Sequence, residues 1–337
     1  MMEMPEVSVV IAAYNAADTI ERAIQSALAQ RDVAVEILVV DDFSTDETRA
    51  VVASLVEPEV QLIALNRNLG PGGARNAGFA AARGKWIAVL DSDDTIRPDR
   101  LRRLVDLAER EDAAVAVDNL DVLTLDGRVE RMFAEDLLAR TPYLTLADFI
   151  DSNLIFQSTH NFGYMKPMFR RAFLEENQLA FDTALRIGED YLLLASTLAA
   201  GGKCVVAPEV GYTYHIREGS ISRVLHPHHV DAMLAGDGRF LARFALEGAD
   251  AAAQRRRTRN LEETRAFLAL IQHLKNRSFG PALKVALGDP VALRHLKMPI
   301  AARWRRLTAP SSHRTMAAPR AAPSPSTAQD LALKNKG

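Results

Sequence analysis

Three carboxylates gather within four positions at the end of the apolar run "WIAVLDSDD": Asp91, Asp93 and Asp94, with Ser92 between the first two. Side chains of like charge repel at this distance unless a cation lies among them. Mg²⁺ and Mn²⁺ prefer oxygen ligands and take one or two carboxylates, which leaves positions for substrate phosphates. An Asp-rich turn in which Asp94 caps the next helix explains the same residues. The triplet alone leaves both explanations open.

Two further acidic pairs stand at the edges of apolar segments. Asp41 and Asp42 end the run "VEILVVDD", where a helix-capping turn and a ligand site are both plausible. Glu189 and Asp190 open the helical pattern "EDYLLLASTLAA", where carboxylates in the first turn also complement the helix dipole. These pairs are candidates for general acid–base chemistry or for binding a polar ligand.

A glycine-rich loop, "NLGPGGARNAG", matches neither familiar nucleotide-binding template. A dinucleotide fingerprint starting at Gly70 and Gly72 needs a third glycine where Arg75 stands, and no Gly-Lys-Ser/Thr sequence follows for a phosphate loop. Arg75 remains a candidate for contact with a phosphate through its planar fork of donors, or for a surface salt bridge.

The elements around these residues predict where they meet. The segments "VSVVIAAYN", "VEILVVDD", "VQLIALN", "WIAVLD" and "DAAVAVDNLDVL" have the composition of buried strands. Helical patterns separate them: one follows Asp18 or Thr19, one is capped from Ser44 or Thr45, and two more lie in "GGARNAGFAAARG" and "RPDRLRRLVDLAER". This alternation predicts an α/β fold with a mostly parallel sheet flanked by helices. Ligands bind beyond the carboxyl ends of such strands, where Asn15 and the acidic groups fall.

The rest of the chain predicts three regions. We expect a main domain at residues 1–225, completed by a less periodic α+β portion, then a helical extension at 226–307 and a disordered tail rich in Ala, Pro and Ser at 308–337. His226, His228 and His229 surround Pro227 and are expected in an exposed loop. The basic segment "LRHLKMPIAARWRRL" fits either contact with an anionic membrane surface or a solvated helix face.

Composition narrows the class of protein. With 337 residues, 48% hydrophobic and 25% charged, the chain has the profile of a soluble globular protein. Its formal net charge of −2 gives no general affinity for nucleic acid. Cys204 is the single cysteine, which excludes internal disulfides and fits a reducing compartment. No signal peptide or run of eighteen apolar residues is seen. We expect a cytoplasmic protein, with peripheral contact at the inner face of the membrane as a further possibility.

Four segments in order, "VSVVIAAYN", "ILVVDDFSTDET", "ARNAGFAAARGKWIAVLDSDD" and "RIGEDYLL", resemble the motifs of family 2 glycosyltransferases of the GT-A fold. The likeness covers about Val7 to Ser222, and the segment from Gly163 to Leu193 is similar to members in bacterial exopolysaccharide assembly of the succinoglycan type. The resemblance implies inverting transfer of a sugar from a nucleotide-diphosphate donor, expected to be a UDP-sugar, to a hydroxyl of a saccharide acceptor. It also implies a lipid-linked acceptor, a role in cell-surface polysaccharide synthesis, and Mg²⁺ or Mn²⁺ as cofactor.

The same resemblance implies roles for individual residues. Tyr14 is expected to stack on the uracil base and Asp42 to form a hydrogen bond with it. Asp93 is the expected metal ligand, with Asp91 nearer the ribose and the sugar. Asp190 is the expected catalytic base.

The segment "YTYHIREGSIS" departs from the Tyr-Arg-x-His pattern that members often carry. His215 and Arg217 occupy the two places in exchanged order, so either could reach the diphosphate. His215 is expected to approach the metal or to be structural, which leaves the third metal ligand open. Four residues fall where the family places contacts with the donor sugar or the acceptor: Asn161, Tyr164, Lys166 and Arg171.

Two other functions fit part of the sequence. A sugar-phosphate nucleotidylyltransferase uses a similar fold and metal, but it would need a glycine- and arginine-rich loop after the first strand, where this chain has "YNAA". A catalytically silent module that binds a sugar nucleotide would be expected to lack at least one of Asp42, Asp93 and Asp190, and all three are present.

Overall fold

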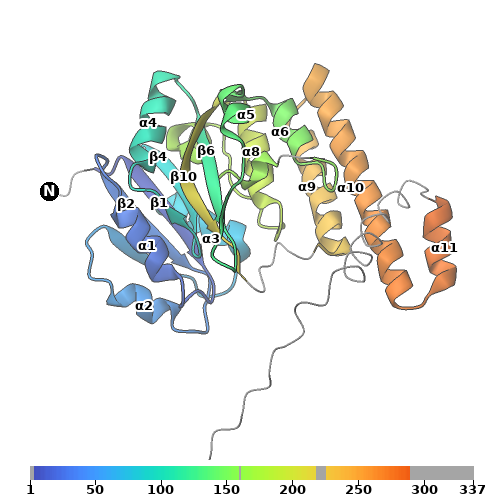
Figure 1. The fold of residues 1–337 in the computed structure, drawn as a ribbon, viewed down its shortest axis with the longest axis horizontal. Coiled ribbons are helices and arrows are strands. Elements are labelled where there is room, and N and C mark those ends of the chain that lie inside the picture. Colours follow the sequence, from blue (N-terminus) through green and yellow to red (C-terminus); the bar gives the residue numbers. More distant parts are fainter. Residues whose placement is uncertain (1–3, 159–160, 218–224, 289–337) are drawn as a thin grey trace, which may run out of the picture. The chain divides into compact units, whose positions relative to one another are not determined.

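The computed structural model describes residues 4–158, 161–217 and 225–288. They belong to one compact unit, Met1–Arg294, and the second unit, His295–Gly337, lies outside the described residues. The expectations for the tail at 308–337 and for the basic segment at 293–307 therefore stay predictions. The described residues form a ten-stranded sheet with helices packed against it (Figure 1), which confirms the predicted α/β fold.

The sheet is mostly parallel, as predicted. Its strands lie in the spatial order β3 (Val60–Ala64), β2 (Val35–Asp41), β1 (Val7–Ala13), β4 (Trp86–Asp91), β9 (Met168–Arg170), β6 (Val115–Leu123), β10 (Cys204–His215) and β5 (Thr95–Ile96). Two short strands lie off this path: β7 (Val129–Arg131) beside β6 and β8 (Tyr143–Leu144) beside β10. Strands β1 to β4 pair in parallel, β6 pairs in parallel with β10, and β9 runs antiparallel between β4 and β6. The strands that carry the predicted site residues therefore end at one edge.

Helices on both faces bury the strands. In the first part of the chain these are α1 (Ile20–Leu28), α2 (Thr48–Ser54), α3 (Gly70–Ala81) and α4 (Arg100–Arg110). The side chains of β1 alternate between two cores: Val9 and Ile11 belong to the cluster that contains Ile24 of α1, whereas Val10 belongs to the cluster that Phe79 of α3 packs against. A Cβ at Gly78 of α3 would lie 2.4 Å from Val10 Cγ1, so glycine permits this close approach.

Two predicted helix starts need correction. The second helix begins at Thr48 and not at Ser44 or Thr45, because the Asp46 carboxylate accepts hydrogen bonds from Thr48 and from the backbone amide of Ala17 and so keeps residues 42–47 as a loop. The first helix begins after Thr19 as expected, but the Thr19 hydroxyl donates to the carbonyl of Ala16 and does not cap the helix.

The second half of the chain adds shorter elements and then long helices. They are α5 (Glu135–Ala139), α6 (Leu146–Ser152), the 3₁₀ turn Phe162–Tyr164, α7 (Arg171–Glu176), α8 (Glu189–Ala199), α9 (Pro227–Arg243), α10 (Gly248–Lys275) and α11 (Phe279–Gly288). Helix α10 packs on α6 and α9, and α9 packs on α8 (Figure 1). The described part of the predicted extension is thus helical. The three histidines are not in a loop: His226 caps α9, and His228 and His229 lie in its first turn.

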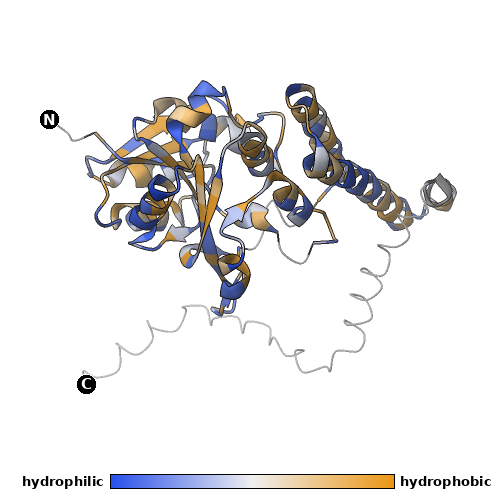
Figure 2. Ribbon diagram, turned by 90° about the horizontal axis from the view of Figure 1, so that it is seen from above, coloured by the Kyte–Doolittle hydropathy of each residue, from blue (hydrophilic) through white to orange (hydrophobic). Residues whose placement is uncertain are grey.

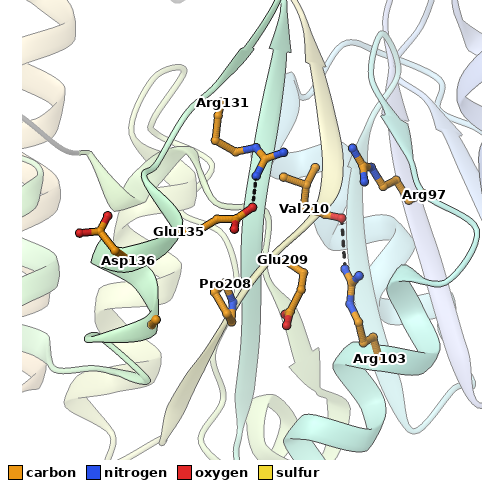
Figure 3. Close-up of a pocket in the computed structure, with 9 residues that line it drawn as sticks. Arg97, Arg103, Arg131, Glu135, Asp136, Pro208, Glu209 and Val210 are labelled. Carbon is orange, nitrogen blue, oxygen red and sulfur yellow. Dashed lines mark hydrogen bonds and ion pairs between the residues drawn. The ribbon is translucent and has the colours of Figure 1, made fainter.

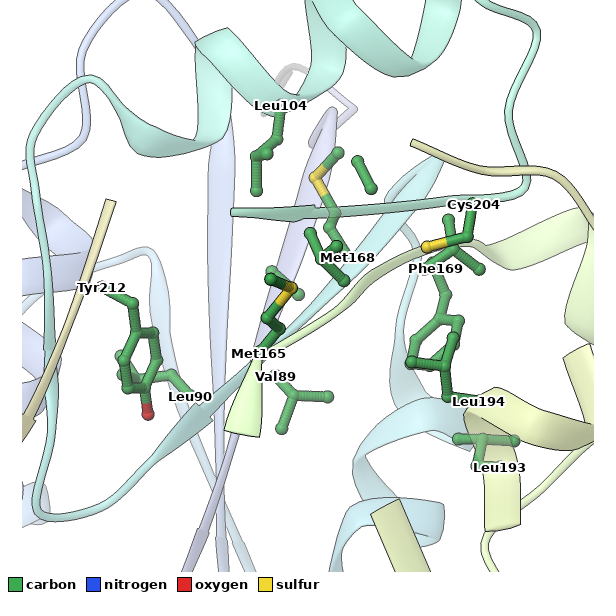
Figure 4. Close-up of a cluster of buried hydrophobic side chains, with 14 of the residues drawn as sticks. Val89, Leu90, Leu104, Met165, Met168, Phe169, Leu193, Leu194, Cys204 and Tyr212 are labelled. Carbon is green, nitrogen blue, oxygen red and sulfur yellow. The ribbon is translucent and has the colours of Figure 1, made fainter. Parts of the chain in front are cut away.

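The hydrophobic core continues from the sheet to α8. Met168 and Phe169 of β9, Leu104 of α4, Leu194 of α8 and Cys204 of β10 are all buried in it (Figure 4). Hydrophobic residues are frequent along the strands, and they alternate with hydrophilic residues along the helices (Figure 2). No helix in the described ranges is long and apolar enough to cross a membrane.

Candidate active site

A cavity of about 930 Å³ opens at the carboxyl ends of β1, β2 and β4. The pairing register places these ends together, because Ala13 of β1 pairs with Asp41 of β2 and Ala12 pairs with Asp91 of β4. Residues of α3, α8, α9 and α10, with the loops next to them, line the remainder of the cavity. Six predicted site residues line it: Tyr14, Asp42, Arg75, Asp91, Asp93 and Asp190.

Tyr14 and Asp42 lie on adjacent loops that are joined by hydrogen bonds. Asn15 has a left-handed backbone (φ 50°), which asparagine tolerates better than most residues, and its side chain accepts a hydrogen bond from the amide of Thr45 at 2.9 Å. This turn leaves half of Tyr14 exposed (50%). The buried Asp42 carboxylate accepts hydrogen bonds from two backbone amides, and burial raises its pKa although these bonds oppose the rise. Tyr14 therefore offers an aromatic face, and Asp42 offers a hydrogen-bond acceptor in a fixed position.

The Asp91 carboxylate is held between two cations. One oxygen lies 2.7 Å from Arg75 Nη2 and the other 2.6 Å from Lys166 Nζ. Burial alone would raise the pKa of Asp91, but the two positive charges hold it well below its usual range. Asp91 is therefore a firmly charged group.

Asp93 and Asp94 differ in their surroundings. Asp94 is fully buried and accepts hydrogen bonds from the Tyr212 hydroxyl (2.6 Å) and the His215 amide (2.8 Å), so it stabilises the turn from inside and does not cap α4. Asp93 faces the cavity, and only its backbone carbonyl has a described partner, Arg22. Burial, followed by the charges of Asp94 and Asp91, raises the pKa of Asp93 to about 6.

The first turn of α8 brings two more carboxylates to the same cations. Gly188, with φ +90°, precedes the helix in a conformation that side chains rarely adopt. Arg75 Nη1 lies 2.9 Å from Glu189 and 3.1 Å from Asp190, and Lys166 Nζ lies 3.3 Å from Asp190. Burial and the adjacent Asp190 charge raise the pKa of Glu189 to about 7.

Arg75 is thus not part of a surface salt bridge. Only 8% of its side chain is exposed, and its guanidinium connects three carboxylates inside the cavity. Burial would lower the pKa of Arg75, but Asp190 and Asp91 raise it. Such a cation can bind either a carboxylate or a phosphate.

His215 is the predicted site residue that does not line the cavity. Its backbone amide and its ring Nδ1, 3.9 Å from an Asp94 oxygen, face the buried side of the turn. Arg217, two residues on, does line the cavity. No group of three or more His, Cys, Asp or Glu side chains in the described part of the chain is arranged to hold a metal ion. A direct metal contact by His215 stays a prediction.

A second cavity, of about 530 Å³, is lined by three arginines: Arg97, Arg103 and Arg131 (Figure 3). Each of them is already in an ion pair with a carboxylate of its own neighbourhood. This second cavity contains none of the predicted site residues, so the first cavity is the candidate active site.

The comparisons with known proteins agree with this geometry. The family described as "Glycosyl transferase family 2" matches residues 8–173. The chain is 62% identical over 337 residues to the succinoglycan biosynthesis protein ExoO of Rhizobium meliloti, covering 99% of this chain and 96% of that protein. The chain belongs to glycosyltransferase family 2. It is also 32% identical to ExoU of the same organism, over 86% of this chain and 84% of that protein.

Solved structures show the family fold. The chain resembles S. aureus TarS 1-349 in complex with UDP-GlcNAc, with a TM-score of 0.60 and 20% identity over 83% of this chain and 90% of that chain. The complex of TarS with UDP gives a TM-score of 0.57 and 22% identity over 76% and 70%. The predicted GT-A fold is confirmed, and the chain is a glycosyltransferase.

The remaining cavity residues divide into candidates that the sequence had named and residues that it had not. Asn161, Tyr164 and Lys166 were named as unranked candidates and line the cavity, whereas Arg171 donates to Gly84 and Glu175 elsewhere. Among the lining residues that were missed are Asn153, Arg186, Met233 and Arg257. The family match ends at residue 173, and three of these four lie beyond it. For Arg257 a signal existed, since it lies at helical spacing between the buried residues 253 and 261.

Proposed function

We propose that this glycosyltransferase transfers a sugar from a UDP-linked donor, with inversion, to a hydroxyl of a saccharide acceptor during succinoglycan-type polysaccharide assembly. One observation carries the proposal: a single cavity collects Tyr14, Asp42, Asp93 and Asp190 from four separate elements. The similarity to the ExoO protein supports the type of polysaccharide.

The nucleotide is proposed to lie against Tyr14 and Asp42. An exposed aromatic ring can stack on a base, and a fixed carboxylate can accept a hydrogen bond from its N–H group. The TarS complexes with UDP and UDP-GlcNAc, which share this fold, support a uridine nucleotide. Which hexose the donor carries depends on the lining residues near Asp91.

The residues present fit a Mg²⁺ or Mn²⁺ ion held by Asp93. Among the described residues, no side chain forms a hydrogen bond or a close ion pair with the Asp93 carboxylate. The charge of Arg217 lowers its pKa, but burial and the neighbouring carboxylates still raise it, and a bound cation would offset that charge. Divalent ions of this kind need few protein ligands, since substrate phosphates and water supply the others. When bound, such an ion offsets the negative charge that develops on the leaving diphosphate.

Asp190 is proposed as the general base. Its carboxylate takes the proton of the acceptor hydroxyl while that oxygen bonds to the anomeric carbon and the bond to the diphosphate breaks on the opposite face. The anomeric centre is inverted, and no covalent enzyme intermediate forms. General-base assistance of this kind contributes about 10²- to 10⁴-fold in rate.

Arg75 and Lys166 are proposed to couple donor binding to release of this base. Each cation contacts both Asp91 and Asp190. A bound diphosphate adds negative charge that competes for the same two cations. Donor binding therefore weakens their hold on Asp190 and frees it to accept a proton.

The acceptor is proposed to be lipid-linked, with transfer at the cytoplasmic face of the membrane. The similarity to a polysaccharide-assembly protein supports this arrangement. The basic segment at 293–307 is the proposed region of peripheral membrane contact.

Release of UDP tests the proposal. The chain is incubated with UDP-glucose, UDP-galactose or UDP-N-acetylglucosamine and with a lipid extract from succinoglycan-producing cells, with Mn²⁺ or with EDTA. We expect UDP release that needs Mn²⁺ and that the extract raises well above the slow hydrolysis of the donor by water. The Asp190→Asn variant should transfer at least ~100-fold more slowly. It should bind the donor at least as tightly as the parent in titration calorimetry, because the Asp190 charge no longer competes for Arg75 and Lys166.

The outcomes separate the alternatives. Donor binding with Mn²⁺ but no UDP release with any extract would indicate a silent binding module. An active Asp190→Asn variant would mean that another group is the base.

A further inference from the structure

Part of the cavity wall comes from helices that follow the family match. Met233 of α9 and Arg257 of α10 line the cavity together with Tyr191, the residue after Asp190. Both helices are fixed by packing on α6 and α8. This side carries none of the residues assigned to the nucleotide, so it is free to take the second substrate.

Arg257 is buried and held on two sides. Its guanidinium carbon lies 3.6 Å from the centroid of the Tyr191 ring, and its Nε donates to both carboxylate oxygens of Asp237 at 3.2 and 3.0 Å. Gln254 also donates to Asp237 at 2.9 Å. Only 6% of the Arg257 side chain is exposed. A long side chain that normally samples many rotamers is therefore preorganised.

The terminal nitrogens of Arg257 form no hydrogen bond with the described residues. Neither terminal nitrogen of Arg257 donates a hydrogen bond to any residue in the described ranges, and neither is sealed off from solvent. The hydroxyl of Tyr191, a residue that is only 6% exposed, also lacks a partner there. Buried polar groups are nearly always paired, so unpaired groups in a cavity wall indicate a place for a ligand.

The surroundings favour a neutral saccharide over an anion. Asp237 already balances the charge of Arg257, and it would repel a second negative group. Tyr164 and Tyr214, with ring centroids 6.4 Å apart, add aromatic faces to the same cavity, and Asn153 adds an amide. Hydrogen-bond donors combined with aromatic rings suit the hydroxyls and C–H faces of sugars.

We propose that Arg257 is an acceptor-binding residue: its two terminal nitrogens donate to hydroxyl oxygens of a neutral saccharide and orient the attacking hydroxyl at Asp190. The proposal rests on the proposed function. It assigns acceptor recognition to α10, outside the part of the chain that the family match covers.

Replacement of the hydrogen-bonding nitrogens of Arg257 tests this assignment. Arg257→Met removes the terminal nitrogens and keeps an apolar side chain over Tyr191, and Arg257→Met with Asp237→Asn also removes the carboxylate left unpaired. The control is Arg265→Met, because Arg265 lies on the same helix with half of its side chain exposed. The probe is a panel of neutral hexose oligosaccharides of two to six sugars, titrated in the presence of UDP and Mn²⁺. Donor affinity and hydrolysis of the donor by water are measured in parallel.

We expect at least a tenfold loss of oligosaccharide affinity in both Arg257 variants, with donor affinity and hydrolysis within twofold of the parent and the control unchanged. Unchanged oligosaccharide affinity overturns the proposal, as does a parent protein that binds no member of the panel. An equal loss of donor and oligosaccharide binding also overturns it, because the role would then be structural. A separate assay offers each bound oligosaccharide to the parent protein with a UDP-sugar and Mn²⁺; binding without any transfer in that assay would contradict the proposed function and not the role of Arg257.

Discussion

Glu189 and Asp190 are adjacent in the sequence, yet the structure gives them different environments. Glu189 is buried (7% exposed) and contacts Arg75, whereas the Asp190 side chain is 27% exposed and shares two cations with Asp91. The more exposed carboxylate can reach an incoming hydroxyl. Ionisation of the buried Glu189 carboxylate costs free energy, and this cost makes the stability of the fold depend on pH.

The pKa of Glu189 predicts a pH-dependent effect on stability. Burial raises it from 4.5 to about 7, so the folded protein keeps a proton that the unfolded chain has released. The stability that this group contributes is fully present below pH 4.5 and is lost as the pH rises through 7. Gln does not titrate, so the free energy of unfolding of Glu189→Gln should not fall in this way. The difference between the variant and the parent should therefore shift in favour of the variant by about 2 kcal/mol as the pH rises from 5 to 8. Chemical denaturation at both pH values measures the difference.

A control separates this effect from general charge removal. Glu175 is exposed and pairs with Arg171 on α7, so Glu175→Gln should shift stability equally at both pH values. If the Glu189→Gln and parent stabilities change in parallel with pH, the pKa of Glu189 is not raised.

At the residue scale, groups at strand ends were predictable and groups reached through tertiary packing were not. Asp42, Asp91 and Asp93 follow apolar strands, and a parallel sheet brings such ends together. Arg257 stands in a run of three arginines. Its helical spacing to residues 253 and 261 places it on their face of α10, but the packing of α10 decides that this face turns inward. The sequence did not show that His215 lies outside the cavity lining, because that depends on Asp94, the third carboxylate of the cluster, which faces the core and fixes the His215 backbone there.

At the element scale, a buried ion pair connects α4 to the sheet and to the site. Arg100 and Asp118 of β6 are both fully buried, with three hydrogen bonds of 3.0 to 3.1 Å between them. Arg100 Nη2 also donates to the backbone carbonyl of Lys166 at 2.6 Å. The pair therefore positions the segment before β9 from which Lys166 reaches Asp91.

Loss of one partner of this pair should be far more harmful than loss of both. Arg100→Met removes all three hydrogen bonds from the buried Asp118 and leaves it only the more distant Arg103, at 3.8 Å. Loss of the main partner of a buried ion pair typically costs about 3 to 5 kcal/mol. Arg100→Met combined with Asp118→Leu removes the unpaired charge and should recover most of that loss. Arg110→Met on the same helix, two-thirds exposed, should change stability little. Urea denaturation compares the three; a single variant as stable as the double would contradict a cost from the unpaired carboxylate.

The elements themselves were predictable in proportion to their length and regularity. The long apolar strands and the amphipathic helices of the first 123 residues follow the expected periods. Strand β9 has three residues, too few to show a period, and yet it separates β4 from β6. Its place depends on contacts with both neighbours, which local sequence does not contain.

At the scale of the whole molecule, the helices α9 and α10 complete the fold that carries the site. Val230, Met233 and Leu261 form a buried cluster, and Ile155 and Ile187 from the sheet-bearing part pack against it. Asn260 of α10 exchanges hydrogen bonds with the backbone of Ile155. The division at residue 225 stays a prediction about where the family fold ends, and these contacts make it an unfavourable place to cut the chain.

Two truncations test whether the helices belong to the same folding unit. A chain that ends at Arg294 keeps the whole compact unit and should melt within about 2 °C of the full chain, since its core is intact. A chain that ends at residue 225 would expose the surfaces of α6 and α8 that α9 and α10 cover, including Tyr191 and the wall beside Asp190. It should aggregate or melt at least ~10 °C lower. Circular dichroism on heating measures both, and donor binding by the shorter chain would show how far the nucleotide half depends on the helices. A chain ending at 225 that melts like the full protein would mean that α9 and α10 only rest on a fold completed without them.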